Sequence, residues 1–360
     1  VRKPVPLFIL MRALGVESDK SIIEHCLLDL EKYKSYTHLF IPSIHDAGKV
    51  FNQSNALKYI ATLTKGKTIP HVLEILSDYF LPHIGEVNFT DKAYFLGYMV
   101  FELLKVYNKD NKPTDRDSFK FKRVELSGSL IYDLFKEYYN LQQKNIFQKI
   151  DKEYHYHQGS YNTSNNFIGL IMLNYKEFFS ERVLETGFKK AFKGNWGAQE
   201  HTKRVGVVQD LNRLSFNAAL SHLRKVNLPL DSSAKVIGPR LLHSSQWGII
   251  DPVDTPDGGN VGLHKHLAIM AFITNSVSGI PILKWLQTNT NIQVLSDNSP
   301  LNNSYLCKVF INGKWVGAIS KPNEMVDLFK SHRRLAIIPI YTSINWDIGN
   351  NTIHINTDSI

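Results

Sequence analysis

The pair Asn312-Gly313 lies between two short runs rich in β-branched and aromatic residues, within the stretch from Cys307 to Ile319. Asn-Gly supplies the two positive φ angles of a type I′ turn, and this turn matches the twist of paired strands. The pair therefore predicts an antiparallel hairpin, so this part of the chain must form a sheet. The pattern that follows predicts a helix over Asn323 to Arg333 and two strands, over Leu335 to Ile344 and Thr352 to Asn356. Together these elements predict a small α+β module.

The first 150 residues carry a helical pattern instead. From Ser21 to Tyr36 apolar residues recur with helical spacing, and Ser21 and Glu24 have the spacing of a capping box. Further helices are expected at three places: His71 to Phe80, Ala93 to Tyr107 and Leu130 to Ile150. The most apolar run begins at Ala93, but it is shorter than the roughly 18 residues that a membrane span needs. We therefore expect a buried helix there and no membrane association.

Polar segments rich in turn-forming residues separate these regions. The stretch from Asn108 to Arg123 is expected to be a loop, and the Gly, Ser and Asn cluster from Gly159 to Asn166 marks a domain boundary. A largely helical stretch from Phe167 to Gly194 follows, and then a single helix from Val207 to Val226. The whole pattern predicts a multidomain α+β fold: mainly helical first, mixed in the middle, and a small α+β module at the end.

Composition limits the classes of protein that fit. The chain has 360 residues, of which 43% are hydrophobic and 21% charged, as in globular proteins of several domains. Cys26 and Cys307 are the only cysteines, which excludes a zinc ribbon or a disulfide framework and fits a reducing compartment. The sequence starts at Val1 and stops at Ile360 within a strand-like stretch, so we expect a segment of a larger chain.

The positive charge is concentrated in one stretch. From Thr186 to Ser245 ten basic residues face three acidic ones, which accounts for +7 of the net charge of +9. Such a concentration favours a polyanionic partner over an ordinary solvated surface. On one helix from Val207, the side chains of Gln209, Arg213 and Arg224 would lie within roughly 60° of one another, facing a sugar-phosphate backbone. Further cations expected to contact nucleic acid are Lys203, Arg204, Lys225, Lys235 and Arg240.

An acidic turn with two prolines and two adjacent glycines follows, from Asp251 to Leu263. Asp251, Asp254 and Asp257 offer oxygen ligands, but their spacing of three does not match an EF-hand loop. Two histidine pairs lack an obvious third ligand: His155 with His157, and His264 with His266. We expect no metal site in this chain, and a metal-dependent hydrolase built on the three aspartates is the weakest of the functions considered.

Five blocks of this region occur in a specific order and spacing. They are GNWGAQ (Gly194 to Gln199), RVGVVQDLNR (Arg204 to Arg213), LSHLRKVNLPL (Leu220 to Leu230), GPRLLHSSQWGIIDPVDTPDG (Gly238 to Gly258) and NVGL (Asn260 to Leu263). Together they resemble the fork region of the second-largest, β-type subunit of multisubunit DNA-directed RNA polymerases. PLFILMRALGVESDKSIIEH (Pro6 to His25) and DRDSFKFKRVELSG (Asp115 to Gly128) resemble that subunit's lobe, and VFINGKWVG (Val309 to Gly317) resembles its external domain.

The resemblance implies an organisation in four parts. These are a lobe over 1–152, a return through the protrusion over 153–194, a fork over 195–275 and part of the external domain over 276–360. It also implies that the fork lies beside the active centre, near the RNA-DNA hybrid and the downstream DNA. Glu200 to Val205 is similar to the first fork loop and Asn227 to Val236 to the second.

Individual residues take roles from the same resemblance. Gln209 matches a glutamine that contacts the backbone of nascent RNA. Asp254, Asp257 and Asn260 belong to a turn that supports the active centre, and no residue of this segment is expected to be catalytic. The family usually has glutamate where Asp254 and Asp257 stand, so each carboxylate here is one methylene shorter.

The resemblance further implies a working environment. Mg²⁺ would be bound by another subunit, and the partners would be template DNA, nascent RNA, the largest subunit and other polymerase subunits. The blocks are closer to archaeal, eukaryotic and large-DNA-virus enzymes than to bacterial ones. The abundance of Asn, Lys, Ile and Tyr indicates an AT-rich genome, and we favour a virus. The expected location is the nucleus, or the host cytoplasm or virion for a viral enzyme. The alternative function is a non-catalytic nucleic-acid-binding protein that keeps the fork surface.

Overall fold

The structure is a computed structural model that describes residues 3–156, 167–200, 202–295 and 300–357. The chain divides into two compact units. Unit 1 combines Val1–Arg116 with Ile273–Ile360, and unit 2 is Asp117–Phe272. The cluster predicted as a domain boundary, Gly159 to Asn166, lies outside the described residues. Within the described part, no helix has the length and apolar character needed to cross a membrane.

The N-terminal part of unit 1 is helical, as predicted. Its elements are α1 (Leu7–Ala13), α2 (Asp19–Leu27), η1 (Lys34–Phe40), α3 (Ile41–Ala47), α4 (Gln53–Leu63), α5 (Ile69–Glu74), η2 (Ile75–Tyr79), η3 (Pro82–Ile84) and α6 (Phe89–Tyr107). Their apolar faces share one core that includes Phe8, Ile22 and Phe101. The prediction of a helix starting at Ser21 was wrong in its bounds, because Ser18 precedes the first turn of α2 and the helix ends at Leu27.

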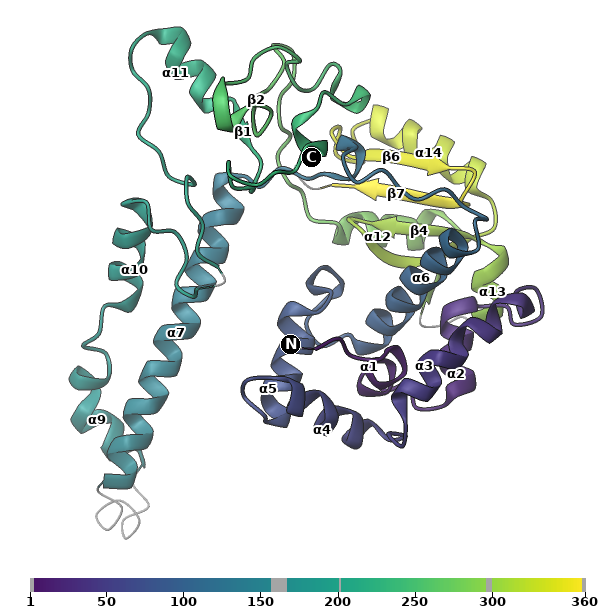
Figure 1. The fold of residues 1–360 in the computed structure, drawn as a ribbon, viewed down its shortest axis with the longest axis horizontal. Helices are drawn as coiled ribbons and strands as arrows, with labels where there is room; N and C mark the ends of the chain where they lie inside the picture. Colours follow the sequence, from purple (N-terminus) through teal and green to yellow (C-terminus); the bar gives the residue numbers. More distant parts are fainter. Residues whose placement is uncertain (1–2, 157–166, 201, 296–299, 358–360) are drawn as a thin grey trace. The chain divides into compact units, whose positions relative to one another are not determined.

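The C-terminal part of unit 1 is the predicted α+β module (Figure 1). It contains α12 (Ile280–Asn289), β3 (Gln293–Val294), α13 (Pro300–Tyr305), β4 (Cys307–Ile311), β5 (Lys314–Ile319), α14 (Pro322–Arg334), β6 (Ser343–Asp347) and β7 (Thr352–Asn356). The sheet order is β3-β5-β4-β7-β6, in which only the β4 and β7 pair is parallel. The predicted hairpin is confirmed, with φ of 49° at Asn312 and 81° at Gly313.

One predicted strand of this module was misplaced. The run from Leu335 to Ile344 was expected to be extended, but β6 starts only at Ser343. Pro339 cannot donate to a strand ladder, and its carbonyl instead accepts a hydrogen bond from Thr342 N in a turn. Of the apolar residues here, Ile338 is buried in the core of the module, whereas Ile337 and Ile340 are exposed.

The two faces of the sheet pack against different helices. Alternate residues of β4, Val309 and Ile311, join a core with α12 and α14. On the opposite face Phe310 joins Trp315 of β5, and Tyr94 of α6 packs with them. The helical part and the α+β module of unit 1 therefore share a core. Figure 1 shows α6 below the strands of the sheet.

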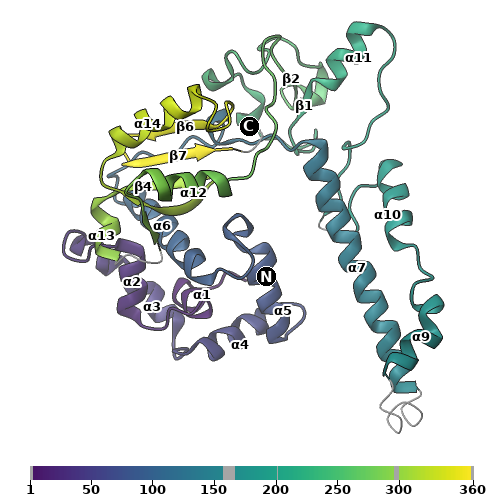
Figure 2. The ribbon, with the colours of Figure 1, turned by 180° about the vertical axis from the view of Figure 1, so that it is seen from behind.

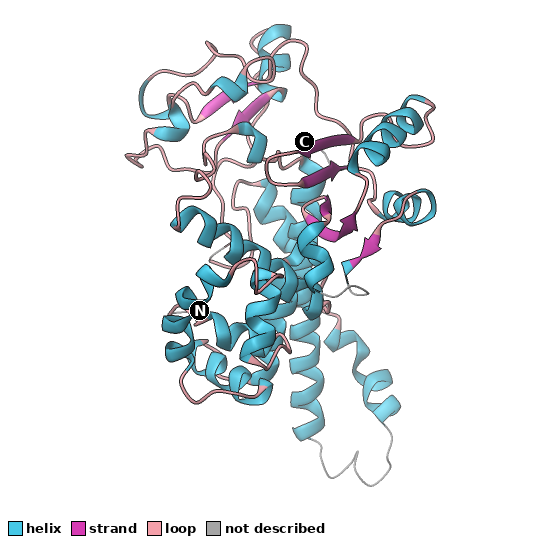
Figure 3. Cartoon of the chain, turned by 90° about the vertical axis from the view of Figure 1, so that its right-hand side faces the viewer, coloured by secondary structure: helices cyan, strands magenta, loops and turns pink. Residues whose placement is uncertain are grey.

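Unit 2 has a long helical hairpin and a loop-rich segment. Its helices are η4 (Phe119–Phe121), α7 (Ser127–Tyr156), α9 (Phe167–Phe178), α10 (Val183–Phe192), α11 (Phe216–Leu223), η5 (Gly238–Arg240), η6 (Ser244–Gln246) and η7 (Gly258–Asn260). Both α9 and α10 run beside α7, which the view from behind also shows (Figure 2). The loop-rich segment contains a two-stranded ribbon, β1 (Lys225–Asn227) with β2 (His264–His266) (Figure 3).

Helix α6 approaches α2 so closely that only glycine fits at the contact. A Cβ atom at Gly97 would lie 2.3 Å from the carbonyl oxygen of His25. We expect Gly97→Ala to destabilise unit 1 by about 1 to 3 kcal/mol, because overpacking outweighs the gain in helix propensity of about 1 kcal/mol. Gly128→Ala on α7, where nothing lies within 4 Å, is the control and should be neutral or slightly stabilising. Urea unfolding of both variants measures the difference, and equal midpoints would contradict the contact.

Candidate nucleic-acid interface

The candidate interface is built on the segment from Val207 to Phe272, whose backbone is mostly irregular. The prediction of one helix from Val207 to Val226 was wrong. Ser215 is extended, and its hydroxyl accepts a hydrogen bond from Ala218 N, so α11 starts only at Phe216. The helix ends at Leu223, and β1 follows after one residue. Gln209, Arg213 and Arg224 consequently do not share one helical face.

Gln209 lies before α11 and is held by two hydrogen bonds. Its side-chain Nε2 donates to Gly206 O at 2.9 Å, and its Oε1 lies 3.0 Å from His222 Nε2. Asn212 N donates to His222 Nδ1 at 3.1 Å, so Nε2 is the nitrogen that carries the proton and donates to Gln209. The carboxamide of Gln209 is thus fixed by a histidine that sequence reasoning did not single out.

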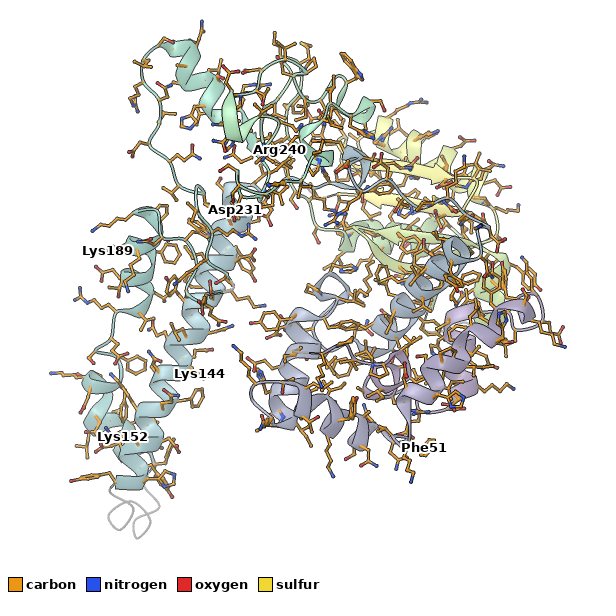
Figure 4. The ribbon with its side chains drawn as sticks, viewed as in Figure 1. Phe51, Lys144, Lys152, Lys189, Asp231 and Arg240 are labelled. Carbon is orange, nitrogen blue, oxygen red and sulfur yellow. The ribbon has the colours of Figure 1, made fainter. Side chains whose placement is uncertain are left out.

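The side chain of Arg240 is hydrogen-bonded to backbone carbonyls of its own unit. It lies at the end of η5, within the loop-rich segment, where Figure 4 labels it. Its Nη1 donates to Gly259 O at 2.7 Å and Val261 O at 2.9 Å, and its Nη2 donates to Ser232 O at 3.0 Å and Ala234 O at 3.3 Å. One side chain therefore ties the predicted second fork loop to the end of the acidic turn. We call these contacts the Arg240 clamp.

Two more of the predicted nucleic-acid contacts are engaged within unit 2. Arg224 donates to Ala268 O at 2.6 Å and Ala271 O at 2.8 Å, which fixes the chain after β2. Arg204 forms an ion pair with Glu125 on a half-exposed surface. Carbonyl partners leave the charge of Arg224 uncompensated, whereas Glu125 neutralises Arg204 locally.

The remaining predicted cations have no ion pair or side-chain hydrogen bond among the described residues. Lys203, Arg213 and Lys235 are exposed, and Lys225 is half-buried in β1. Beside Arg213 in sequence, Leu214 is 90% and Phe216 is 82% exposed. Exposed cations next to an exposed aromatic ring can contact phosphates and stack on bases. We define Lys203, Arg213 and Lys235 as the open cations.

The acidic turn is held to β2 by its own side chains. Asp251 Oδ1 accepts hydrogen bonds from Val253 N at 2.9 Å and Asp254 N at 3.2 Å, and these bonds hold the pKa of Asp251 below its usual range. Asp254 Oδ2 lies 3.2 Å from His266 Nδ1. Thr255 Oγ1 donates to His264 O at 3.0 Å, so the turn is braced along the whole of the strand.

The other two predicted support residues face outward. Asp257 and Asn260 are exposed, and no hydrogen bond to either side chain is present among the described residues. Their backbone is nevertheless fixed, because the neighbouring carbonyls of Gly259 and Val261 accept from the Arg240 clamp. Asp254 is thus an internal brace, whereas Asp257 and Asn260 present polar groups on a held backbone.

The ribbon contains a histidine that the sequence pattern placed in no role. His264 Nδ1 lies 2.6 Å from Asn227 Oδ1, across the strand pair. Burial, together with the charges of Lys225 and His266, lowers the pKa of His264. The imidazole is therefore neutral at physiological pH, and it donates to Asn227 rather than adding to the positive charge.

The described residues do not bring together a metal site. No group of three or more His, Cys, Asp or Glu side chains is placed to hold an ion in the described ranges. A carboxylate oxygen of Asp251 accepts a hydrogen bond within the turn, and a carboxylate oxygen of Asp254 lies next to His266. The resemblance assigns Mg²⁺ to another subunit, and we derive no step through the ion.

Three family models match the chain in order. "RNA polymerase Rpb2, domain 2" matches residues 1–125, "RNA polymerase Rpb2, domain 3" matches 209–273, and "RNA polymerase Rpb2, domain 4" matches 309–359. The chain belongs to the Rpb2 family. The Rpb2 domain 3 match covers Gln209, Arg240 with its clamp and the acidic turn, whereas Lys203 and Arg204 precede it.

Curated Rpb2 relatives align along the chain. It is 32% identical to DNA-directed RNA polymerase II subunit RPB2 of Schizosaccharomyces pombe and 35% identical to that of Encephalitozoon cuniculi, each over 100% of the chain and 29% or 31% of the relative. It is 28% identical to DNA-directed RNA polymerase subunit Rpo2 of Saccharolobus solfataricus, over 99% of the chain and 31% of the relative. The chain therefore spans about 30% of the length of these relatives.

Proposed function

We propose that this chain works in template-directed RNA synthesis, as the lobe, fork and external part of the second-largest subunit of a DNA-directed RNA polymerase. The fork positions template DNA, the RNA-DNA hybrid and downstream DNA, while other subunits supply the metal-binding catalytic groups. The observation that carries the proposal concerns two of the open cations: Arg213 and Lys235 are exposed and unpaired among the described residues of the matched domain 3.

The cations of the fork form two groups with different roles. The open cations contact phosphates, a sequence-independent role that suits an enzyme that must read every template. Arg240 and Arg224 are positioning residues, because their donors already hold backbone carbonyls of unit 2. Gln209 reaches nascent RNA from a side chain pre-oriented by His222, which lowers the entropy cost of the contact.

The acidic turn supports the active centre from a braced backbone. Asp254 secures the turn through His266, and Asp257 and Asn260 offer outward polar groups to neighbouring parts of the complex. The partners proposed are the largest subunit, other polymerase subunits, template and transcript. The proposed parts are a lobe (1–152), a return through the protrusion (153–194), a fork (195–275) and part of the external domain (276–360). The relatives named above come from eukaryotes and an archaeon. A eukaryotic enzyme would be located in the nucleus, whereas a viral enzyme would work in the host cytoplasm or virion.

Salt dependence tests the open cations in the assembled polymerase. We expect Arg213→Ala and Lys235→Ala each to lower the slope of log affinity against log salt by about one for a template-transcript scaffold, because each removes one phosphate contact. Affinity of the scaffold is measured by fluorescence anisotropy at several salt concentrations.

The matched control is Lys152→Ala on α7, which removes an exposed cation outside the fork. Its slope should equal that of the unmodified enzyme. Unchanged slopes in both fork variants would refute the phosphate role, and failure of the full-length chain to co-purify with a largest subunit would favour a non-catalytic binding protein.

A further inference from the structure

A surface pocket of about 470 Å³ lies in the helical part of unit 1, away from the residues of the fork segment in sequence. Its lining comes from the end of α4 and the turn that leads into α5: Lys58, Ala61, Thr62, Lys67 and Ile69. Ala61 is buried and Ile69 is half-buried, so the floor is apolar. Lys58 and Lys67 are exposed and provide the charged rim.

The pocket lies in a segment with an uncompensated charge. From Ala47 to Leu73 the sequence contains four lysines and no aspartate or glutamate. Glu74, the first acid after this segment, lies 3.2 Å from His71. Neither Lys58 nor Lys67 has an ion pair among the described residues. The rim therefore keeps its positive charge available to a partner.

The turn that carries Lys67 is held in place. Thr64 is buried and its hydroxyl donates to Ala61 O at 2.9 Å, which anchors the end of α4. Lys67 has a φ of 50°, a left-handed conformation that costs roughly 1 to 2 kcal/mol for a side chain other than glycine. The backbone that carries Lys67 is thus held by the fold before any partner arrives, which favours binding.

We propose that this pocket binds an acidic peptide segment of a partner protein. One aliphatic or aromatic side chain of the peptide enters the pocket over Ala61 and Ile69, and flanking carboxylates meet Lys58 and Lys67. A pocket of this volume falls within the roughly 300 to 1,000 Å³ of ligand sites. A sugar-phosphate backbone would satisfy the lysines but has no group for the apolar floor, so the chemistry favours a peptide over nucleic acid.

The test uses the polymerase assembled with the full-length chain and a fluorescein-labelled peptide of eight acidic residues around a central phenylalanine. Anisotropy titration at low salt should show saturable binding that weakens at least tenfold when alanine replaces the phenylalanine. Lys58→Glu with Lys67→Glu should weaken binding at least tenfold. Lys34→Glu, an exposed lysine of the same unit, is the charge control and should leave binding within twofold.

Thr62→Trp separates the apolar contact from the charges. Thr62 is exposed on α4, so the substitution fills the pocket without disturbing the core. It should remove the preference for phenylalanine over alanine while a weak, salt-sensitive affinity remains. A single-stranded oligonucleotide of twelve thymidines tests the rival class of partner. The proposal would be overturned if the peptide showed no saturable binding. It would also be overturned if the oligonucleotide bound more tightly than the peptide, provided that Lys58→Glu with Lys67→Glu abolished this binding and Thr62→Trp left it unchanged.

Discussion

A Gly262→Ala substitution is expected to detach the acidic turn from the Arg240 clamp. The added Cβ would lie 2.2 Å from Arg240 O and 2.5 Å from Arg240 Cα, both of which are backbone atoms that cannot rotate away. Gly262 also has a φ of 71°, which strains any other residue. Steric overlap and backbone strain together should cost about 2 to 6 kcal/mol of local stability.

Hydrogen exchange detects this loss directly. Gly262 N donates to Thr255 Oγ1 at 2.9 Å and Leu263 N donates to Asn260 O at 3.1 Å, so both amides report whether the turn is closed. In the variant their exchange should approach that of an unstructured loop, while peptides from unit 1 keep their protection. The rate of transcript elongation by the assembled enzyme should decrease when the turn opens, because the backbone of Asp257 and Asn260 is then no longer fixed.

Gly258→Ala is the matched control. Gly258 has a similar φ of 75°, but nothing lies within 4 Å of the added Cβ. Its cost should be limited to about 1 to 2 kcal/mol of backbone strain. Arg240→Lys probes the same clamp while keeping the charge, and it should also expose the turn, because an ammonium cannot donate to four carbonyls at once. Equal protection in Gly262→Ala and Gly258→Ala would show that the clamp does not hold the turn.

The elements that sequence predicted well are those set by local physics. Asn312-Gly313 determines its own backbone angles, and the strands on either side follow from it. The α6 helix and the α14 helix repeat their apolar residues at helical spacing, so their existence was readable even where their ends moved by a few residues. The family resemblance placed these elements in order along the chain.

The internal bonding of the fork was not readable from sequence. The carbonyls that Arg240 binds lie between 6 and 21 residues away, and nothing in a sequence pattern distinguishes such an arginine from one that faces solvent. The helix expected from Val207 failed because the extended Ser215 caps a new helix, a local signal that was present but outweighed by apolar spacing. Charge counts therefore led to the prediction of a nucleic-acid interface, which stays a prediction, and only the contacts separate its open cations from its positioning residues.

A Lys308→Met substitution is expected to stabilise unit 1 at neutral pH. Lys308 points from the centre of the sheet toward the rings of Tyr98 and Trp315, and its Nζ lies 5.9 Å and 6.0 Å from their centroids. Burial, aided by the charge of Lys105, lowers the pKa of Lys308 from 10.5 to about 8. A shift of this size corresponds to about 3 kcal/mol against the charged form. Weak attraction of the ammonium to the two rings favours the charged form and does not offset the effect of burial.

The pH dependence distinguishes this cause from better packing. The folded state binds the Lys308 proton more weakly than the unfolded state, so the unfolded state holds more protons between pH 8 and 10.5. Stability of the unmodified chain should therefore rise with pH across this window relative to the variant. The advantage of methionine is greatest below pH 8 and disappears as the pH passes the unfolded value.

Urea unfolding followed by tryptophan fluorescence measures this difference, because the buried Trp315 lies beside Lys308. Lys308→Arg is the control: it keeps a charge throughout the window, so it should be destabilised and its stability relative to methionine should not change with pH. A constant difference between lysine and methionine from pH 7 to 10.5 would mean that the Lys308 ammonium reaches solvent. A difference that closes with the expected sign would mean that the shared core of α6 and the sheet holds a lysine whose charge opposes folding.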